Sequence, residues 1–415
     1  MAASREGLPV RASLLLAAGT FVVGAVAPLY DTYVPALLER HLGRSAWVGA
    51  AMGIDNVLAL LLVPVVGALS DGARFRGGRR VPFVLAALPF VVAGLALLPA
   101  ADRVGLVALL GAMILLDAAL AVWRAPFSAL LAELIPSGQR SKTEGIQGVA
   151  MCLGAMVVLG AARPLAAAGP DRPFLLAAAL AGVVWLIHLA WLREPVHAVG
   201  AREAGAASPL ASLRAAFAAG GSVTPRFFAA CLLFHMAFQA FSSWFTLHGS
   251  ERFHTSVAEV SIGFIAVAIA TLVGSLPAGW LGARYGRRRV AVAGVAGMAV
   301  SCLLLQVAPS LGGVTALLFC FGLAWSLPTA NLLPMALELG PPNRAGSLAG
   351  AFLLVQSVAG VIGPALIGGW FDLRGSKASL FLALVGFLAG ALVLLAGLRP
   401  GFGEADGAGT HRVAG

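Results

Sequence analysis

The stretch GALSDGARFRGGRR, residues 67–80, ends a long apolar run with an acidic residue followed by a cluster of arginines. A related stretch, GWLGARYGRR, ends another apolar run at residues 279–288. A second pair follows at similar spacing, AELIP at residues 132–136 and LELGP at residues 337–341. Because the members of each pair are separated by about half of the 415 residues, we interpret the chain as two consecutive copies of one six-helix unit.

Apolar residues fill the chain between these loops. Hydrophobic residues make up 60% of the sequence and charged residues 11%, whereas a soluble domain has about 25% charged residues. So little charge cannot cover a soluble protein, and the apolar runs have the length of about 20 residues that a membrane-spanning helix needs. The sequence predicts an all-α membrane protein with twelve transmembrane helices in two pseudo-symmetric six-helix bundles. The expected spans are residues 12–37, 46–70, 81–99, 104–131, 143–167, 173–193, 226–248, 256–282, 290–309, 312–338, 346–371 and 378–398.

The bundles and their connections have predicted boundaries. We expect an N-terminal bundle at residues 1–193, a cytoplasmic linker at 194–224, a C-terminal bundle at 225–399 and a flexible tail at 400–415. Lys and Arg are concentrated in both termini and in one of the two sets of loops. The positive-inside rule therefore predicts an inner-membrane protein with both termini in the cytoplasm.

The formal net charge of +10 does not indicate nucleic-acid binding, because the arginines lie in short loops and form no continuous basic stripe. The sequence has no phosphate-binding Gly-x-x-x-x-Gly-Lys loop, no nucleophile–base–acid signature of an enzyme, and no metal-ligand spacing among its four cysteines. We therefore expect a monomeric protein that is not an enzyme and holds no cofactor or metal. Its expected partners are the lipid bilayer, a small solute and protons.

The first stretch resembles the signature of the major facilitator superfamily, a G-x-x-x-D element followed by G-R-R. The second copy departs from that pattern, with Ala283 in place of the acidic residue. The segment Ile54-Asp55-Asn56, and the segment from Leu116-Asp117 to the ALLAEL run at 129–134, resemble the glycoside–pentoside–hexuronide cation symporters and the sucrose–proton symporters. This resemblance implies transport by alternating access, with Asp117 as the proton-coupling residue.

Four charged residues are predicted inside the spans, where each costs at least about 2.5–3.5 kcal/mol and needs a function or a partner. Asp117 lies about 20 Å into its helix, past the middle of the membrane, so an interfacial position is excluded. Its alternative role is that of a structural carboxyl held by a neighbouring helix. Arg124 lies two turns along the same face and could sense the charge of Asp117. Alternatively, Arg124 forms a fixed ion pair with Asp31 or Asp55.

Other polar and aromatic side chains in the spans are candidates for a sugar site, which needs hydrogen-bonding groups and flat apolar surfaces. An ion site is a further role for the acidic candidates, although one Asp–Asn pair is too little to claim a sodium site. Each candidate has the alternative role of packing between helices. The substrate candidates are Asp31, Asp55, Asn56, Trp123, His235, Gln239, Trp325, Asn331 and Gln356.

The charged loops predict a clasp between neighbouring helices on the cytoplasmic side, which forms in one conformation and breaks in the other. A loop that only sets the topology would explain the arginines but not Asp71. The gating candidates are Asp71, Arg79, Arg80, Glu133, Arg287 and Arg288.

These features together favour a proton-coupled symporter of a sugar or glycoside. A proton-coupled exporter of drugs or metabolites is an alternative. The Gly-Pro…Gly-Gly element typical of such exporters is missing from the fifth span, but a similar element, Gly363-Pro364…Gly368-Gly369, lies in the eleventh. A sensor or scaffold that does not transport is the alternative from another class, and it would leave Asp117 without a role.

Overall fold

The computed structural model describes residues 9–73, 75, 78–136, 139–194, 223–340 and 345–398, which are helical almost throughout. Most of the predicted linker and the whole predicted tail lie outside these residues. The N-terminal bundle contains α1 (Val10–Leu42), α2 (Ser45–Met52), α3 (Ile54–Gly72), α4 (Val81–Val104), α5 (Leu106–Leu134), α6 (Arg140–Ala168) and α7 (Arg172–Trp191). The C-terminal bundle contains α9 (Val223–Phe253), α10 (Val257–Val260), α11 (Ile262–Tyr285), α12 (Arg287–Val307), α13 (Leu311–Leu337), α14 (Ala345–Arg374) and α15 (Leu380–Ala396).

The predicted all-α fold is confirmed, with two interruptions that hydropathy does not reveal. Among the described residues, eleven segments are long and apolar enough to cross a membrane, and α15 is a further apolar helix of 17 residues. The second predicted span is interrupted at Gly53, between α2 and α3, and the eighth at Ser261, between α10 and α11. Several helices are longer than predicted, because helical hydrogen bonding continues past the apolar run. One of them is α9, which ends at Phe253.

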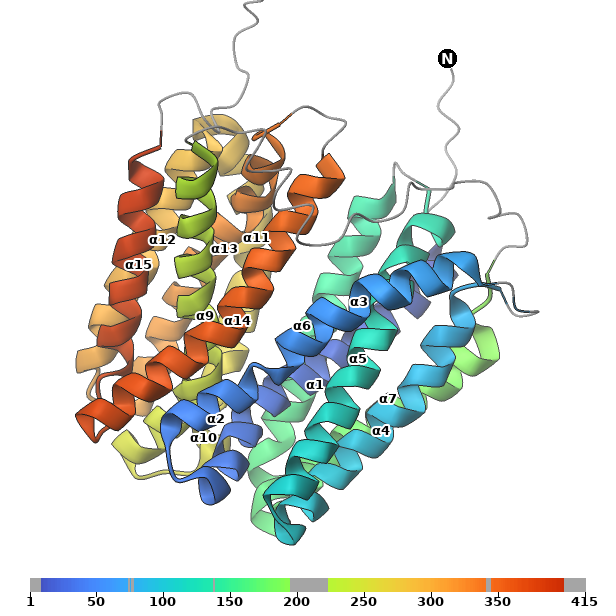
Figure 1. Cartoon of the computed structure of the whole chain (residues 1–415), viewed down its shortest axis with the longest axis horizontal. Coiled ribbons are helices and arrows are strands. Elements are labelled where there is room, and N and C mark those ends of the chain that lie inside the picture. Colours follow the sequence, from blue (N-terminus) through green and yellow to red (C-terminus); the bar gives the residue numbers. More distant parts are fainter. Residues whose placement is uncertain are drawn as a thin grey trace, which may run out of the picture.

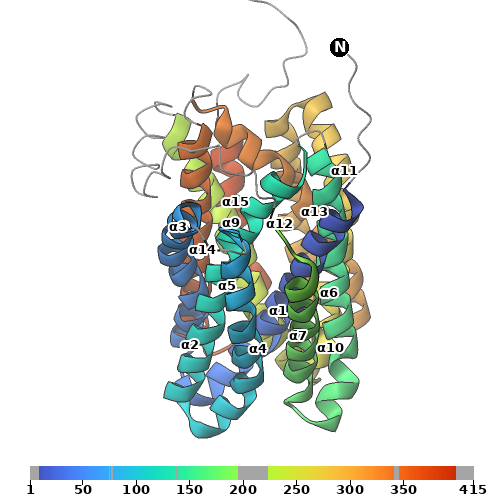
Figure 2. The ribbon, with the colours of Figure 1, turned by 90° about the vertical axis from the view of Figure 1, so that its right-hand side faces the viewer.

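The two bundles lie side by side, with α4–α7 on the right of Figure 1 and α9–α15 on the left, while α2 extends to the left beneath α14. We call the end that carries Asp71, Arg80 and Arg287 the basic end, and the end that carries Arg44 and Lys377 the junction end. The bundles meet at the junction end, where α2 contacts α14 and α1 contacts α9 (Figure 1). Toward the basic end the ribbons of α3 and α14 diverge, while α6 contacts α11 on another side of the molecule (Figure 2).

Glycines bring α2 and α14 into backbone contact. A Cβ atom at Gly49 would lie 2.2 Å from the Pro364 carbonyl oxygen, and one at Gly368 would lie 2.2 Å from the Ser45 carbonyl oxygen. Any larger residue at either position would force the two helices apart. The Gly-Pro…Gly-Gly element of the eleventh span therefore packs at the interface between the halves, as small residues do between membrane helices.

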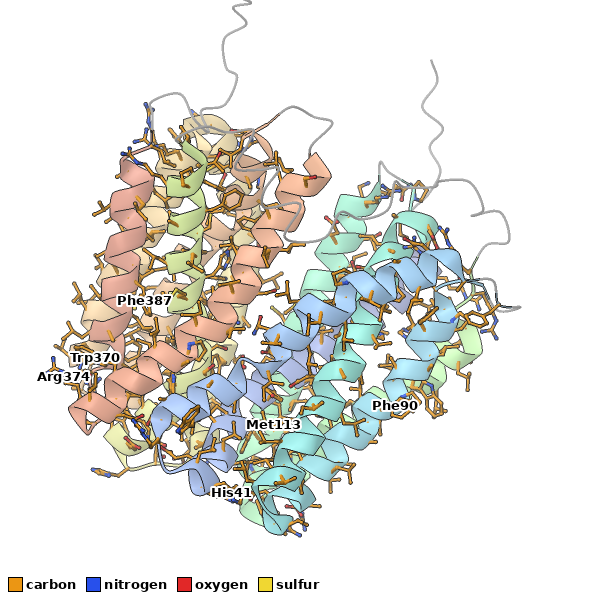
Figure 3. All side chains as sticks on the ribbon, viewed as in Figure 1. His41, Phe90, Met113, Trp370, Arg374 and Phe387 are labelled. Atoms are coloured by element: carbon orange, nitrogen blue, oxygen red, sulfur yellow. The ribbon has the colours of Figure 1, made fainter. Side chains whose placement is uncertain are left out.

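Large apolar side chains cover the outside of the bundles. Phe90 of α4 is exposed on an outer face, whereas Met113 of α5 is fully buried (Figure 3). Leu61, Val107 and Leu276 are exposed in the same way on other helices. An apolar surface of this extent requires lipid around it, which agrees with a membrane-spanning fold.

Candidate functional site

A buried carboxyl group lies between two helices of the N-terminal bundle. Tyr30 Oη of α1 donates a 3.0 Å hydrogen bond to Asp117 Oδ2 of α5, and Asp117 is only 5% exposed. A buried polar group is stable when it has a hydrogen-bond partner, and Tyr30 is that partner here. The sequence predicts the depth of Asp117, and the structure adds its donor.

Asp31, the residue after Tyr30, contacts the other bundle. Its Oδ2 accepts a hydrogen bond from Ser242 Oγ of α9. One turn further along α9, Thr246 Oγ1 donates a 3.1 Å hydrogen bond to the Thr32 carbonyl oxygen of α1. We call these four residues the polar seam. The seam joins α1 to α9 across the two halves, directly beside the buried acid.

Asp55 and Asn56 begin α3 and add a third carboxyl group. Both the backbone N–H and Nδ2 of Asn56 donate 2.6 Å hydrogen bonds to Asp55 Oδ1. Asn56 also lies against Gly360 of α14, where a Cβ atom would be 2.4 Å from Asn56 Cγ. Asp55 interacts electrostatically with both Asp31 and Asp117. The carboxyl groups of α1, α3 and α5 therefore lie near enough for the charge of one to affect the others.

Arg124 of α5 places a positive charge beside these carboxyl groups. Its side chain is exposed, and it interacts electrostatically with Asp55 and Asp117. None of the described residues forms an ion pair with Arg124 within 4.0 Å. Because a guanidinium group is always charged and carries five N–H donors, it has donors to offer a substrate or an ionised Asp117.

Three of the predicted substrate residues come together in the C-terminal bundle. Gln356 Nε2 of α14 donates a 3.2 Å hydrogen bond to His235 Nε2 of α9, so a neutral ring carries its proton on Nδ1. The Trp325 ring of α13 meets His235 edge-on and stacks on Phe238, with centroids 3.8 Å apart in the stacked pair. Gln239 follows His235 by one turn and is half-buried. Phe234 also stacks on Trp325, with centroids 4.7 Å apart, so Phe238 is the partly exposed ring of this group. The group combines hydrogen-bonding side chains with an aromatic ring.

Two other predicted substrate residues lie in packing positions. Trp123 of α5 lies against Gly19 of α1 and is 5% exposed. Asn331 Nδ2 of α13 donates hydrogen bonds of 3.1 and 2.8 Å to the carbonyl oxygens of Ala278 and Leu327. Asn331 thereby connects α13 to α11, so the structure does not bring these two side chains into the group around His235.

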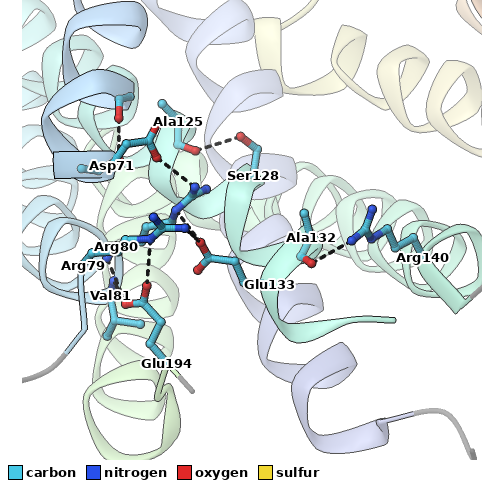
Figure 4. Close-up of polar contacts among 12 residues, drawn as sticks. Asp71, Arg79, Arg80, Val81, Ala125, Ser128, Ala132, Glu133, Arg140 and Glu194 are labelled. Atoms are coloured by element: carbon cyan, nitrogen blue, oxygen red, sulfur yellow. Dashed lines mark hydrogen bonds and ion pairs between the residues drawn. The ribbon is translucent and has the colours of Figure 1, made fainter. Parts of the chain in front are cut away.

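The predicted gating residues of the first repeat form one cluster at the basic end (Figure 4). Arg80 forms 2.9 Å ion pairs with both Asp71 and Glu133, and Arg79 also pairs with Glu133. Glu194, which follows α7, accepts 3.0 and 3.3 Å hydrogen bonds from the backbone N–H groups at the start of α4. The cluster therefore connects α3, α4, α5 and the end of α7. Sequence reasoning missed Glu194, although an acid directly after the last arginine of a span is a usable signal.

Ion pairs hold each of the two charged clusters together within its own half. The hydrogen bond to Glu133 raises the pKa of Arg79 and outweighs the opposite effect of burial, so Arg79 remains a cation. In the second repeat, Arg287 pairs with Glu338, and Arg288 donates to carbonyl oxygens at the end of α15. These ion pairs stay within one half in both repeats.

Polar contacts do cross between the halves at the junction end. Lys377, in the loop before α15, binds Glu39 of α1 and Glu251 of α9 and is 8% exposed. Asp372, near the end of α14, accepts hydrogen bonds of 2.8 and 3.0 Å from the first two backbone N–H groups of α2. A carboxylate is favourable at a helix N-terminus, so Asp372 caps a helix of the opposite half. We call Glu39, Glu251, Asp372 and Lys377 the junction latch. None of these four residues is among the site residues predicted from the sequence.

Two duplicated bundles, each with a charged cluster at the matching loop, agree with the superfamily resemblance of the sequence. The sequence model of the Major Facilitator Superfamily matches residues 16–364 and, in a second match, residues 250–411. The chain belongs to the major facilitator superfamily. Proteins of this superfamily are transporters and not, in general, enzymes, which agrees with the absence of an enzyme signature.

Several known proteins are similar to this chain over most of its length. Tetracycline resistance protein, class G, from Vibrio anguillarum is 24% identical over 357 residues, which are 85% of this chain and 87% of the relative. The structure of the nucleoside transporter NupG has a TM-score of 0.74 at 16% identity, covering 93% of this chain and 99% of its own. A bacterial homologue of the human lysosomal transporter Spinster, inward-facing and unoccupied, has a TM-score of 0.74 at 15% identity, covering 93% and 96%. The human organic anion transporter MFSD10 has a TM-score of 0.63 at 21% identity, covering 93% and 99%.

These structural likenesses establish the major facilitator fold alone. The narrower resemblance to glycoside–pentoside–hexuronide and sucrose symporters receives no support from them. The substrate must therefore be inferred from the chain's own side chains.

Proposed function

We propose that this superfamily member transports a small organic solute by alternating access and couples that transport to protons at Asp117. The buried hydrogen bond between Tyr30 and Asp117 carries the proposal. A carboxyl group can take up and release a proton, and the Tyr30 hydroxyl can donate to its ionised form or accept from its protonated form. Arg124 of α5 places a positive charge near this carboxyl group.

The polar seam supports a route from the proton to the conformation. Because Tyr30 and Asp31 are adjacent on α1, a movement of Tyr30 upon protonation of Asp117 also moves Asp31 relative to Ser242. The hydrogen bond across the halves then changes in strength, and the two conformations change in relative stability. With the junction end held closed by the latch, we propose that substrate enters this state from the basic end.

A sugar or glycoside, taken up together with protons, is the substrate class that we propose first. His235, Gln239 and Gln356 supply hydrogen-bonding groups from the C-terminal bundle. Phe238, which stacks on Trp325 and is partly exposed, supplies a flat apolar surface that suits one face of a pyranose ring.

A proton-coupled exporter of drugs or metabolites is the second candidate. The similarity to a tetracycline resistance protein favours it. The aromatic surface beside Trp325 would also suit an amphipathic drug, and three carboxyl groups would suit a substrate with a positive charge. In either case we propose an inner-membrane location with both termini in the cytoplasm.

Transport by purified protein in proteoliposomes tests the proposal. A thermal-shift screen against sugars, glycosides and tetracycline first selects a ligand, because ligand binding raises the unfolding temperature. An imposed pH gradient and a pH dye inside the vesicles then report the direction of solute and proton. Symport predicts that both move the same way, and export predicts opposite directions. Binding without flux in either direction would favour the sensor or scaffold and refute the proposal.

A further inference from the structure

An open apolar hollow lies on the outside of the N-terminal bundle, between the start of α1 and the end of α7. Its membrane-facing part is lined by Leu14, Ala18, Ile187 and Trp191. It continues over the helix ends to Leu134 at the end of α5. Leu14 and Trp191 are large apolar side chains that none of the described helices covers, since both are more than half exposed.

Two arginines line this hollow where it reaches the basic end. Arg11 lines both parts of the hollow, is exposed, and forms no ion pair with a described residue. Arg193 lines the second part and is also exposed, while its Nη1 donates to the Leu189 and Leu192 carbonyl oxygens. The adjacent Glu194 does not compensate them, because its carboxylate binds the start of α4 and is 3% exposed. The hollow therefore combines an apolar surface with positive charge at one end.

We propose that this hollow binds an anionic phospholipid, with the phosphate between Arg11 and Arg193 and one acyl chain along Leu14, Ala18 and Ile187. A phospholipid has the required distribution of polarity, since its charged headgroup lies at the membrane surface and its chains run into the apolar layer. Guanidinium groups match phosphate oxygens in paired hydrogen bonds, which favours an anionic headgroup over an uncharged ligand.

The position of Trp191 supports the same occupant. Indole rings in membrane proteins concentrate at the boundary between headgroups and acyl chains. Trp191 is the last residue of α7 and lines both parts of the hollow. It therefore lies where the glycerol backbone of a bound lipid would be. This inference does not depend on the transported solute.

Native mass spectrometry of the full-length protein in detergent tests the site. The protein is titrated with phosphatidylglycerol or with phosphatidylcholine of the same chain length. The unmodified protein is expected to bind phosphatidylglycerol more tightly. Arg11→Gln and Arg193→Gln should each weaken that binding about fivefold, and both together about 25-fold, from roughly 1 kcal/mol per arginine near an anionic headgroup. Arg226→Gln is the matched control, because Arg226 is exposed at the start of α9, outside the hollow, and should change nothing.

A second variant tests the apolar part of the site. Ala18→Phe fills part of the hollow without changing charge, and it should weaken phosphatidylglycerol binding. Thermal unfolding confirms that the variant is folded. Equal affinity for the two lipids, or a preference that survives the double arginine substitution, would overturn the proposal. The rival occupant is the chain's own N-terminal segment. Phosphatidylglycerol binding that appears only after deletion of residues 2–8 would assign the hollow to that segment and would also overturn it.

Discussion

Tyr30 and Asp31 are consecutive residues of α1, yet they bind opposite halves of the protein. Tyr30 donates to Asp117 within the N-terminal bundle, and Asp31 accepts from Ser242 of the C-terminal bundle. The two side chains are attached to neighbouring positions of one helix, so a displacement of one also displaces the other. The buried acid and the interface between the halves are therefore mechanically linked.

Replacing Asp117 with Asn is expected to reduce transport driven by a pH gradient by about 100-fold or more. The amide keeps the shape and can still accept from Tyr30, but it cannot carry a proton. Substrate binding should persist with a flatter pH dependence, and Asp117→Glu should keep partial activity, limited by the added methylene. Flux in proteoliposomes checks this, with Asp171→Asn at the start of α7 as the control. Near-normal accumulation against a gradient by folded Asp117→Asn would make Asp117 a structural carboxyl.

Replacing Ser242 with Ala should favour opening of the junction end. The change leaves the half-buried Asp31 without its donor in the closed form, and a hydrogen bond to a charged group contributes about 1.5–3 kcal/mol. We expect the ratio of open to closed protein to rise about tenfold, since 1.4 kcal/mol is a factor of ten. Spin labels at the exposed positions Val104 and Val307, one in each half, measure the separation. The control is Ser301→Ala, because Ser301 bonds within its own helix; equal distances in both variants would count against the seam.

Replacing Lys377 with Met should also open the junction end. Glu39 and Glu251 would lose the cation that joins them, and their charges would then repel across the interface. Neutralising both acids in the same protein, by Glu39→Gln and Glu251→Gln, should restore much of the closed form. The same pair of spin labels measures both effects. A closed junction end in the single variant would show that the latch does not hold it.

The latch should be insensitive to pH over the range in which transport is measured. Burial lowers the pKa of Lys377, but its hydrogen bonds to Glu251 and Glu39 outweigh this effect, and the net direction is upward. A cation with a raised pKa contributes fully below its ordinary pKa of about 10.4, and this contribution is lost only as pH rises through the raised value. Distances in a protein in which Asn replaces Asp31, Asp55 and Asp117 should therefore not change between about pH 6 and 9. A pH-dependent opening in that variant would point to another titrating group.

Replacing Asp71 with Asn should slow transport while leaving substrate affinity nearly unchanged. Asp71 binds Arg80 at the basic end, away from the buried acid, so it should affect conformational exchange more than binding. Glu133→Gln should have the larger effect on both rate and thermal stability, because Glu133 binds two arginines and is much less exposed. Flux and equilibrium binding are compared for each protein. A large loss of binding by folded Asp71→Asn would contradict the gating role.

Both termini are expected on the cytoplasmic side. The concentration of Lys and Arg in one set of loops and in the terminal segments motivates this. A reporter enzyme that is active only outside the cytoplasm, fused after Arg412, should be silent. The same reporter inserted in the loop after Leu42 should be active, and the reverse pattern would invert the topology.

Local patterns in the sequence were enough to predict the helices and the duplication. A membrane span is recognised from the mean hydropathy of about 20 consecutive residues, so the spans and the depth of Asp117 can be predicted from the sequence alone. The same applies to the clustered arginines, because a short loop after a helix end keeps Arg79, Arg80 and Asp71 close together. The interruptions at Gly53 and Ser261 escaped prediction, since they do not alter the mean hydropathy of a span.

Only the tertiary structure decided which candidates meet. Tyr30 and Asp117 are 87 residues apart, and Asp31 and Ser242 are 211 apart. Such pairs depend on how helices pack, which hydropathy does not encode. Asn331 is an example of a candidate that meets no other candidate. Its side chain donates to carbonyl oxygens of α11 and α13, and these satisfy a polar residue in a span as well as a substrate would. The sequence by itself therefore determined which side chains need partners inside the membrane, and helix packing determined which partners they have.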